Sequence, residues 1–130
     1  MTIAVWRASG VTFDVDRYLH RFPALTPEAV WHKGQARLGG RLSTGSGFNK
    51  TLFEATSSDA VSEQIVKALE QWRDAAEALV AQEVVSVLDL GLVVGSPHAF
   101  TGNVYVNVNA LHLLATLKIG LTVSAYPSRD

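Results

Sequence analysis

Hydrophobic positions along the chain follow the period of strands in some segments and that of helices in others. Ile3–Ala8, Ala29–Lys33 and Phe48–Ala55 are short and rich in apolar, aromatic or β-branched residues, which is typical of strands. From Val84 to Val94 apolar residues occupy both alternating faces, which predicts a strand in the centre of a sheet. Leu121–Ala125 is expected to close the chain as a further strand.

A sixth strand is expected after a turn at Gly95–His98. There, valines alternate with asparagine and tyrosine, which is the pattern of a strand with one exposed polar face: Asn103, Val104, Tyr105, Val106, Asn107 and Val108.

The period changes to that of a helix in three places. Asp14 is placed to cap a first helix, with Phe13 and Tyr18 at the positions of a hydrophobic staple, and Pro23 ends it. Its apolar positions are spaced at i, i+3, i+4 and i+7: Val15, Tyr18, Leu19 and Phe22.

The main helix is expected after Ser57–Asp59, whose side chains suit a helix start. One long apolar face runs along it: Val61, Ile65, Ala68, Leu69, Trp72, Ala76 and Leu79. A last helix should begin at an Asn109 cap, run to Lys118 and stop at Gly120. Its inward stripe would be Leu111, Leu114 and Leu117.

These elements follow the order β-α-β-β-α-β-β-α-β. We therefore expect an α+β fold in which helices pack on one face of a mixed β-sheet, in a two-layer arrangement. A chain of 130 residues with 48% hydrophobic composition is long enough for one core, so we expect a single domain over residues 1–130.

Composition excludes several function classes. Eleven basic and twelve acidic residues give a net charge of −1, so nothing predicts a nucleic-acid-binding surface. The apolar runs are interrupted and too short to cross a membrane, and Met1–Ser9 does not resemble a secretory signal, so a cytoplasmic protein is expected. The chain has no cysteine, which excludes disulfides, a thiol nucleophile and cysteine zinc sites.

The most unusual segment is Trp31–Gly34 with the basic, glycine-rich run Gln35–Gly47 after it. Its glycines and the cations Lys33, Arg37 and Arg41 could hold an anion, because glycines let backbone amides approach a phosphate. The spacing matches neither a phosphate loop nor a dinucleotide fingerprint. We therefore favour a solvated hairpin whose glycines meet the needs of turns.

Several single residues are binding candidates. Trp31 could anchor a partner but is expected in the core, with His32 pointing away from it. Asp89 lies inside an apolar strand, and we expect an exposed position or an arginine partner for it. A polar sheet face for a ligand or partner could be formed by Asn103, Tyr105 and Asn107, with Thr122 and Ser124 as further members. The same pattern also fits an ordinary sheet with one solvated side.

No catalytic residues or cofactor are predicted. No Gly-x-Ser-x-Gly elbow is present, so serine hydrolase chemistry lacks its usual anchor. No metal site is expected either, because none of the histidines shows the spacing of a helical metal pair: His20, His32, His98 and His112.

The order of these features resembles the bacterial family known as domain of unknown function 4279. The resemblance spans about Ile3 to Tyr126, and its sharpest piece is the Trp31–Gly34 segment followed by Ser46-Gly47-Phe48 at the start of a strand. Phe48 stands where tryptophan is more usual, and Gln35 where an acidic residue is. The resemblance implies a small bacterial α+β domain and carries no activity, cofactor or catalytic residue.

Three hypotheses follow. The first is a non-enzymatic protein-binding module, immunity-like or regulatory, that uses the hairpin and the polar sheet face. The second is a small-molecule or anion binder, with an undetected enzymatic activity as an option, centred on the hairpin and Asp89. The third is a homodimer that forms through unpaired sheet edges, with Trp6 or Trp31 in the interface.

Overall fold

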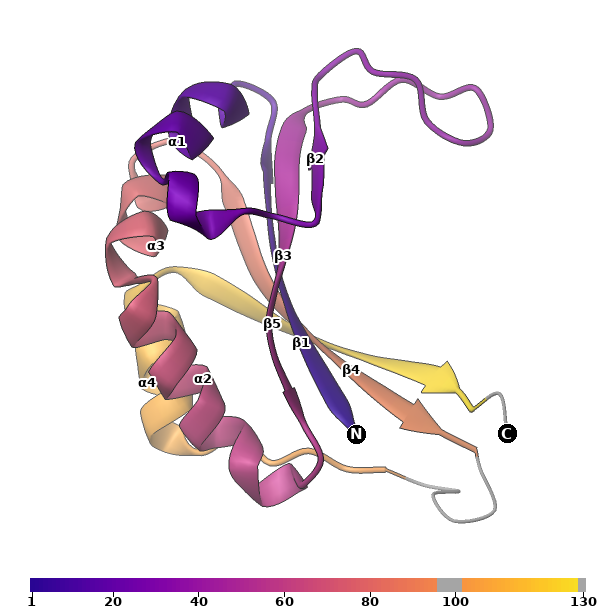
Figure 1. The fold of residues 1–130 in the computed structure, drawn as a ribbon, viewed down its shortest axis with the longest axis vertical. Helices are drawn as coiled ribbons and strands as arrows, with labels where there is room; N and C mark the ends of the chain where they lie inside the picture. Colours follow the sequence, from indigo (N-terminus) through magenta and orange to yellow (C-terminus); the bar gives the residue numbers. More distant parts are fainter. Residues whose placement is uncertain (96–101, 129–130) are drawn as a thin grey trace.

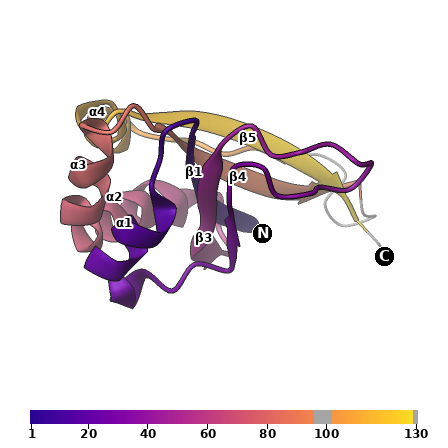
Figure 2. The ribbon, with the colours of Figure 1, turned by 90° about the horizontal axis from the view of Figure 1, so that it is seen from above.

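A twisted, mixed sheet of five strands has all the helices on one of its faces (Figures 1 and 2). The computed structural model describes residues 1–95 and 102–128. The strand order is β2-β3-β1-β4-β5; β4 and β5 are parallel and the other neighbours antiparallel. The strands are β1 (Thr2–Gly10), β2 (Ala29–Trp31), β3 (Ser46–Ala55), β4 (Val85–Val94) and β5 (Ile119–Pro127). The α-helices are α1 (Val15–Arg21), α2 (Val61–Gln71), α3 (Arg73–Val80) and α4 (Val108–Thr116).

The expected α+β class, with helices covering one face of a mixed sheet, is confirmed. Alternation along the strands explains it: the side chains of β1 and β4 that face the helices are buried, and the chain between the strands supplies the apolar helix faces that bury them. On β1 and β4 the buried residues that face the helices are Thr2, Ala4, Trp6, Ala8, Ser86, Leu88, Leu90 and Leu92. β4 lies between β1 and β5, so its expected place inside the sheet is also confirmed.

The densest part of the core is an aromatic cluster beneath α1. The Trp6 ring meets Phe48 edge-on, with centroids 5.3 Å apart, and Tyr18 stacks on Phe48 at 5.6 Å. The buried polar atoms of the cluster are satisfied: Trp6 Nε1 donates to Ser86 Oγ (2.7 Å) and the Tyr18 hydroxyl to the Ala75 carbonyl (2.7 Å). Burial raises the pKa of Tyr18 well above its ordinary value.

Helix α1 begins as its sequence predicts. Asp14 is the N-cap residue, and its carboxylate accepts a hydrogen bond from the Arg17 amide at 3.1 Å. Phe13 and Tyr18 pack edge to face at 5.5 Å, which is the expected staple. Both local signals are therefore confirmed.

The expected main helix is interrupted at Trp72. This residue has φ −106° and ψ 20°, which ends α2 and begins α3. The apolar face continues through the break, because Ile65, Leu69 and Leu79 are all buried. The single continuous helix predicted from the spacing is therefore two helices that share one buried face.

The strand expected at residues 103–108 is absent, so the predicted element order is wrong at this point. Residues 102–107 form no strand, and Val104 and Val106 pack against the core. The Ser62 hydroxyl of α2 donates to the Tyr105 carbonyl and accepts from the Asn107 amide. The alternating pattern thus reflects packing beside α2 rather than pairing in the sheet. Parts of the Gly95–His98 turn lie outside the described residues.

The last helix begins two residues earlier than expected. Asn107, and not Asn109, is its N-cap: the Asn107 carboxamide oxygen accepts from the Ala110 amide at 3.0 Å. Leu111, expected to point inward, is 44% exposed, while Leu113 is buried beside Leu114 and Leu117. The helix then connects two parallel strands, as such a crossover requires.

Candidate functional site

Among residues 1–95 and 102–128, no helix covers the sheet face opposite the helices, and we call it the open face. Its strand positions alternate with the buried ones, and the strand register brings them together across four strands. They comprise apolar, polar and aromatic side chains: Ile3, Val5, Arg7, Ser9, Asn49, Val87, Asp89, Val93, Thr122, Ser124 and Tyr126. A face that mixes apolar positions with one charged centre differs from an ordinary solvated face, because several of its apolar side chains are only half-exposed.

A polar network occupies the centre of the open face. Arg7 of β1 contacts Asp89 Oδ2 with Nε and with Nη2, each at 3.3 Å, and the Ser124 hydroxyl of β5 donates to Asp89 Oδ1 at 2.9 Å. With its amide turned to the orientation that satisfies both of its ends, Asn49 accepts from Arg7 Nη1 at 3.0 Å and donates to the Phe48 carbonyl at 3.1 Å. Asp89 is only 8% exposed, so these partners offset the cost of burying its charge. The network fixes an arginine on the surface in one orientation.

Two aromatic rings flank this network, and each lies over a glycine. The Trp31 ring of β2 lies over Gly47 of β3, and the Tyr126 ring of β5 lies over Gly91 of β4. A Cβ added at Gly47 or Gly91 would come within 2.6 or 2.9 Å of the ring. The glycines therefore make room for rings that lie close to the backbone of the sheet. Trp31 is half-exposed, whereas the sequence suggested a core position for it.

The basic hairpin between β2 and β3 extends beside the open face (Figure 2). Hydrogen bonds give it a defined shape: the Gly34 amide donates to the Ser43 carbonyl and the Ser43 amide to the Gln35 carbonyl, each at 2.8 Å, and the Arg37 amide donates to the Arg41 carbonyl at 2.7 Å. Gly39 and Gly40 form its tip with φ of +86° and +79°, values that favour glycine. The tip exposes Leu38 completely, between two arginines. The predicted hairpin is thus present.

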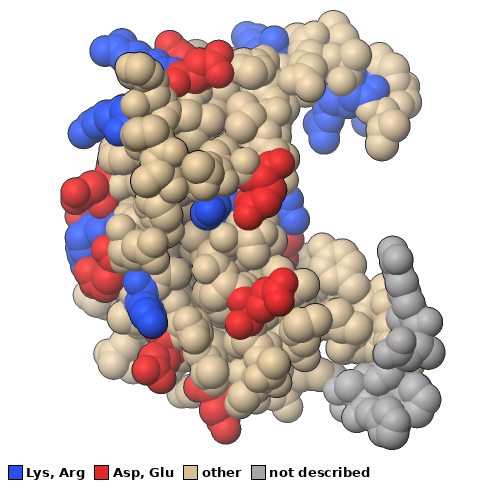
Figure 3. All heavy atoms as spheres, viewed as in Figure 1, with Lys and Arg blue, Asp and Glu red and all other residues tan. Residues whose placement is uncertain are grey.

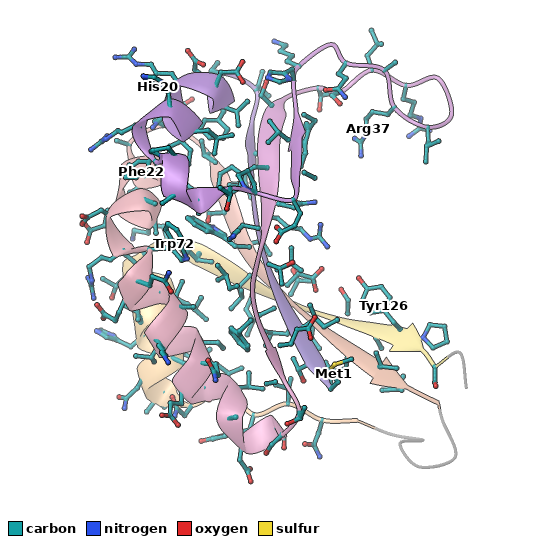
Figure 4. All side chains as sticks on the ribbon, viewed as in Figure 1. Met1, His20, Phe22, Arg37, Trp72 and Tyr126 are labelled. Atoms are coloured by element: carbon teal, nitrogen blue, oxygen red, sulfur yellow. The ribbon has the colours of Figure 1, made fainter. Side chains whose placement is uncertain are left out.

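The hairpin and the strands enclose a hollow. Figure 3 shows the molecule recessed on this side, with cationic side chains of the hairpin above the recess. A pocket of about 460 Å³ lies beneath the hairpin and includes Ser9, Trp31, Arg37 and Ser43 in its lining. A second, of about 290 Å³, lies between β1, β4 and β5 and is bounded mainly by apolar side chains. Figure 4 shows Arg37 directed from the hairpin toward the side on which Tyr126 stands.

Part of the predicted binding set meets at this hollow. Trp31 and Arg37 line the pocket beneath the hairpin, Arg41 lines a neighbouring one at its tip, and Asp89 lines the apolar pocket. Lys33 lies at the base of the hairpin, where its amide donates to Ser46 Oγ. The expected arginine partner of Asp89 exists, and it is Arg7.

Other members of the set lie elsewhere. Tyr105 and Asn107 are on the helix side of the sheet, where Asn107 caps α4, so they do not form a polar sheet face. His32 does have a partner: its Nε2 lies 2.9 Å from Asp16 Oδ1 in an exposed contact that links the end of β2 to α1. Trp6 is 1% exposed and hydrogen-bonded inside the core, so it cannot serve in an interface.

Sequence reasoning missed three residues of the open face, Arg7, Asn49 and Tyr126, whereas Ser124 was already a candidate for a polar sheet face. Arg7 and Asp89 are 82 positions apart, and no local pattern connects them. One signal was available, since Arg7 and Asp89 are each a charge inside an otherwise apolar strand. Two such charges in adjacent strands are expected to pair.

Residues 1–95 and 102–128 contain neither a metal-binding cluster nor a membrane-spanning helix. No group of three or more histidine, aspartate or glutamate side chains in this part of the chain could hold a metal ion. Within the same residues no helix has the length and apolar character needed to cross a membrane. His98, a histidine weighed in the metal argument, lies outside them. Comparison of the chain with protein-family models, curated proteins and solved structures gives no match.

Proposed function

We propose that this chain is a non-enzymatic protein-binding module, immunity-like or regulatory, that receives its partner on the open face beneath the basic hairpin. The observation that carries the proposal is the open face of the sheet, where Arg7 lines one pocket with Trp31 and a second pocket with Tyr126. Tryptophan, tyrosine and arginine are the residue types that supply most of the energy at protein interfaces.

The fixed geometry of these side chains supports binding. Arg7 is held by Asp89 and Asn49, and the rings of Trp31 and Tyr126 rest on glycines. Side chains that are already ordered lose little conformational freedom when a partner arrives. The face is therefore prepared for contact before binding.

The charge of the hairpin indicates the kind of partner. Residues 33–45 contain Lys33, Arg37 and Arg41 and no acidic residue, although the whole chain has a net charge of −1. Leu38 and Leu42 are exposed between these cations. An acidic protein surface with an apolar depression would complement the hairpin, because complementary charge steers association and an apolar contact slows dissociation.

Asp89, the carboxylate at the centre of the open face, fits a structural role better than a catalytic one. Both oxygens of Asp89 already accept hydrogen bonds, from Arg7 and from Ser124. A general base must instead be free to take a proton from a substrate. This arrangement favours binding over chemistry.

Affinity capture from a lysate of the cells that make this protein tests the proposal. The variant K33S/R37S/R41S removes the hairpin charges, and the control R17S/K67S/K118S removes three exposed charges elsewhere. We expect wild type and control to retain the same partner at physiological salt and the hairpin variant to lose it. The proposal is wrong if all three chains capture the same proteins equally.

A small-molecule or anion binder is the second candidate, on a different observation. The pocket of about 380 Å³ next to Trp31 brings together Arg7, Arg37, Gln35 and Asn49, with an indole ring as one wall. Such a lining suits a flat molecule that carries an anionic group. A thermal-shift series with nucleotides, phosphorylated metabolites and inorganic phosphate tests it, because a ligand that binds only the folded chain raises the melting temperature. No shift with any of them would contradict this candidate.

A further inference from the structure

The two edges of the sheet differ in length and in protection. β2 forms one edge and has only three residues, whereas β5 forms the other and has nine. Proteins usually protect a long edge strand with charges or bulges, because its unpaired amides and carbonyls can bind another strand. Ile119–Pro127 contains no charged residue, and β4 is its strand neighbour among the described residues. Within the part of the chain that the structure describes, the outer edge of β5 therefore has no strand beside it and no charged residue to protect it.

Exposed apolar side chains continue from this edge onto the adjacent helix. On the helix side of β5, Leu121 and Val123 are 38% and 53% exposed. Helix α4 packs beside β5 and leaves Val108 and Leu111 exposed at 76% and 44%. A helix that is apolar around most of its circumference is typical of a buried helix. The β5 edge and the helix packed beside it thus both expose apolar side chains, and we call these two elements together the β5 surface.

We propose that this surface binds a second copy of the chain, through antiparallel pairing of the two β5 strands about a two-fold axis at Val123. The sequence of β5 is self-complementary about that position. Val123 would face its own counterpart, Leu121 would face Ala125, and Thr122 would face Ser124. A two-fold interface requires this kind of match, in which each residue and its partner exchange roles.

The chemistry of each pair fits. Thr122 and Ser124 lie on the open face, where hydroxyl pairs across antiparallel strands are favourable. Ser124 donates to Asp89, so its oxygen can still accept from the partner's threonine hydroxyl. The opposite side of the strand pair joins Leu121, Val123 and Ala125 with their counterparts. Pairing would make one continuous sheet from two, with the two open faces on the same side.

The absence of charged residues from β5 and α4 favours a second copy of this chain as the partner. Neither β5 nor α4 carries an aspartate, glutamate, lysine or arginine, so the surface offers nothing to steer a charged partner and does not repel its own duplicate. This interface is separate from the basic hairpin at the β2 side, and it does not depend on the proposed function.

Sedimentation of the purified chain tests the proposal. Wild type should sediment at twice the 14.0 kDa mass of one chain at high micromolar concentration. V123K places a charge at the two-fold axis and should sediment as a monomer. V80K makes the same change at a valine of α3 that is 48% exposed, and it should remain a dimer. A monomeric wild type, or a V123K that is still dimeric, would overturn the proposal.

Cysteine crosslinking tests the register, since the chain has no cysteine of its own. Residues directly opposite in an antiparallel pair have Cα atoms about 4.5 to 5.5 Å apart, which a disulfide can span. V123C should form a covalent dimer on mild oxidation and V80C should not. T122C should crosslink with S124C when the two chains are mixed, and much less with itself. Failure of V123C to exceed V80C would contradict pairing about Val123.

Discussion

The indole ring of Trp31 lies over Gly47 of the neighbouring strand, so closely that a methyl group at Gly47 would come within 2.6 Å of Cζ2. The same methyl group would also press on the β1 backbone at Ala8. G47A should therefore lower the free energy of unfolding by about 1–3 kcal/mol, the usual cost of an overpacked site. Urea denaturation of both chains measures this difference.

Gly91, which lies beneath the Tyr126 ring, provides the comparison with Gly47. A methyl group there meets chiefly the Tyr126 ring, at 2.9 Å, and this ring is 49% exposed and can turn aside. We expect G91A to cost less than about 1 kcal/mol, because the obstacle is movable. Equal losses for G47A and G91A would contradict this account of how the two rings rest on the sheet.

The Arg7–Asp89 pair should behave as a coupled unit. R7M leaves the nearly buried Asp89 carboxylate without its cation and should cost about 1–3 kcal/mol of stability. In R7M/D89N the carboxylate charge is also removed, so no unpaired charge remains buried. The loss of unfolding free energy in this double variant should therefore be about 0.5–3 kcal/mol smaller than the summed losses of R7M and D89N. Strictly additive losses in denaturant unfolding would mean that the pair does not stabilise the open face.

Tyr18 should make the protein sensitive to alkali. Burial raises the pKa of its hydroxyl in the folded chain, and the unfolded chain ionises near the ordinary value of about 10. The resulting stability is complete below that value and decreases as the pH rises above it. Y18F should flatten this alkaline decrease, although it loses the hydrogen bond to Ala75, worth about 1 kcal/mol at neutral pH.

Urea midpoints measured from pH 7 into the alkaline range, for wild type and Y18F, provide the test. The difference between the two chains in tyrosinate absorbance reports Tyr18 directly. If the stability of both decreases in parallel above pH 10, the buried hydroxyl is not the cause.

Two asparagines lie at the start of α4, Asn107 and Asn109, and only Asn107 caps the helix. N107A removes the carboxamide that accepts from Ala110 and should cost about 1 kcal/mol. N109A should change stability by no more than about 0.5 kcal/mol, because that side chain is exposed within the first turn. Thermal unfolding of the two variants distinguishes them, and a larger loss for N109A would contradict the observed cap.

Where the sequence carried local signals, prediction succeeded. Asp14 and the Phe13–Tyr18 pair lie within a few residues of one another, so their spacing predicts the start of α1. The apolar content of both faces of Val84–Val94 likewise predicts a strand inside the sheet. These arguments need only the geometry of one element.

Prediction failed where the local sequence allows two structures equally well and contacts between residues far apart in the chain decide between them. Asn107 and Asn109 can both cap a helix, and leucines on several sides of α4 give no unique inward stripe, so packing against α2 and β5 sets its start. The valines at 104 and 106 alternate like a strand but are partly buried against the core. The Arg7–Asp89–Ser124 network depends on strand order, which no short segment encodes.

Photo-crosslinking from the open face tests the proposed function most directly. A photoreactive amino acid would replace Val85, which is 67% exposed and lines the pocket beneath the hairpin, and in a control Val80 of α3. After irradiation in the cells that make this protein, we predict one discrete protein adduct from position 85 that K33S/R37S/R41S abolishes, and no such adduct from position 80. Identical adducts from both positions, or none from position 85, would contradict the account.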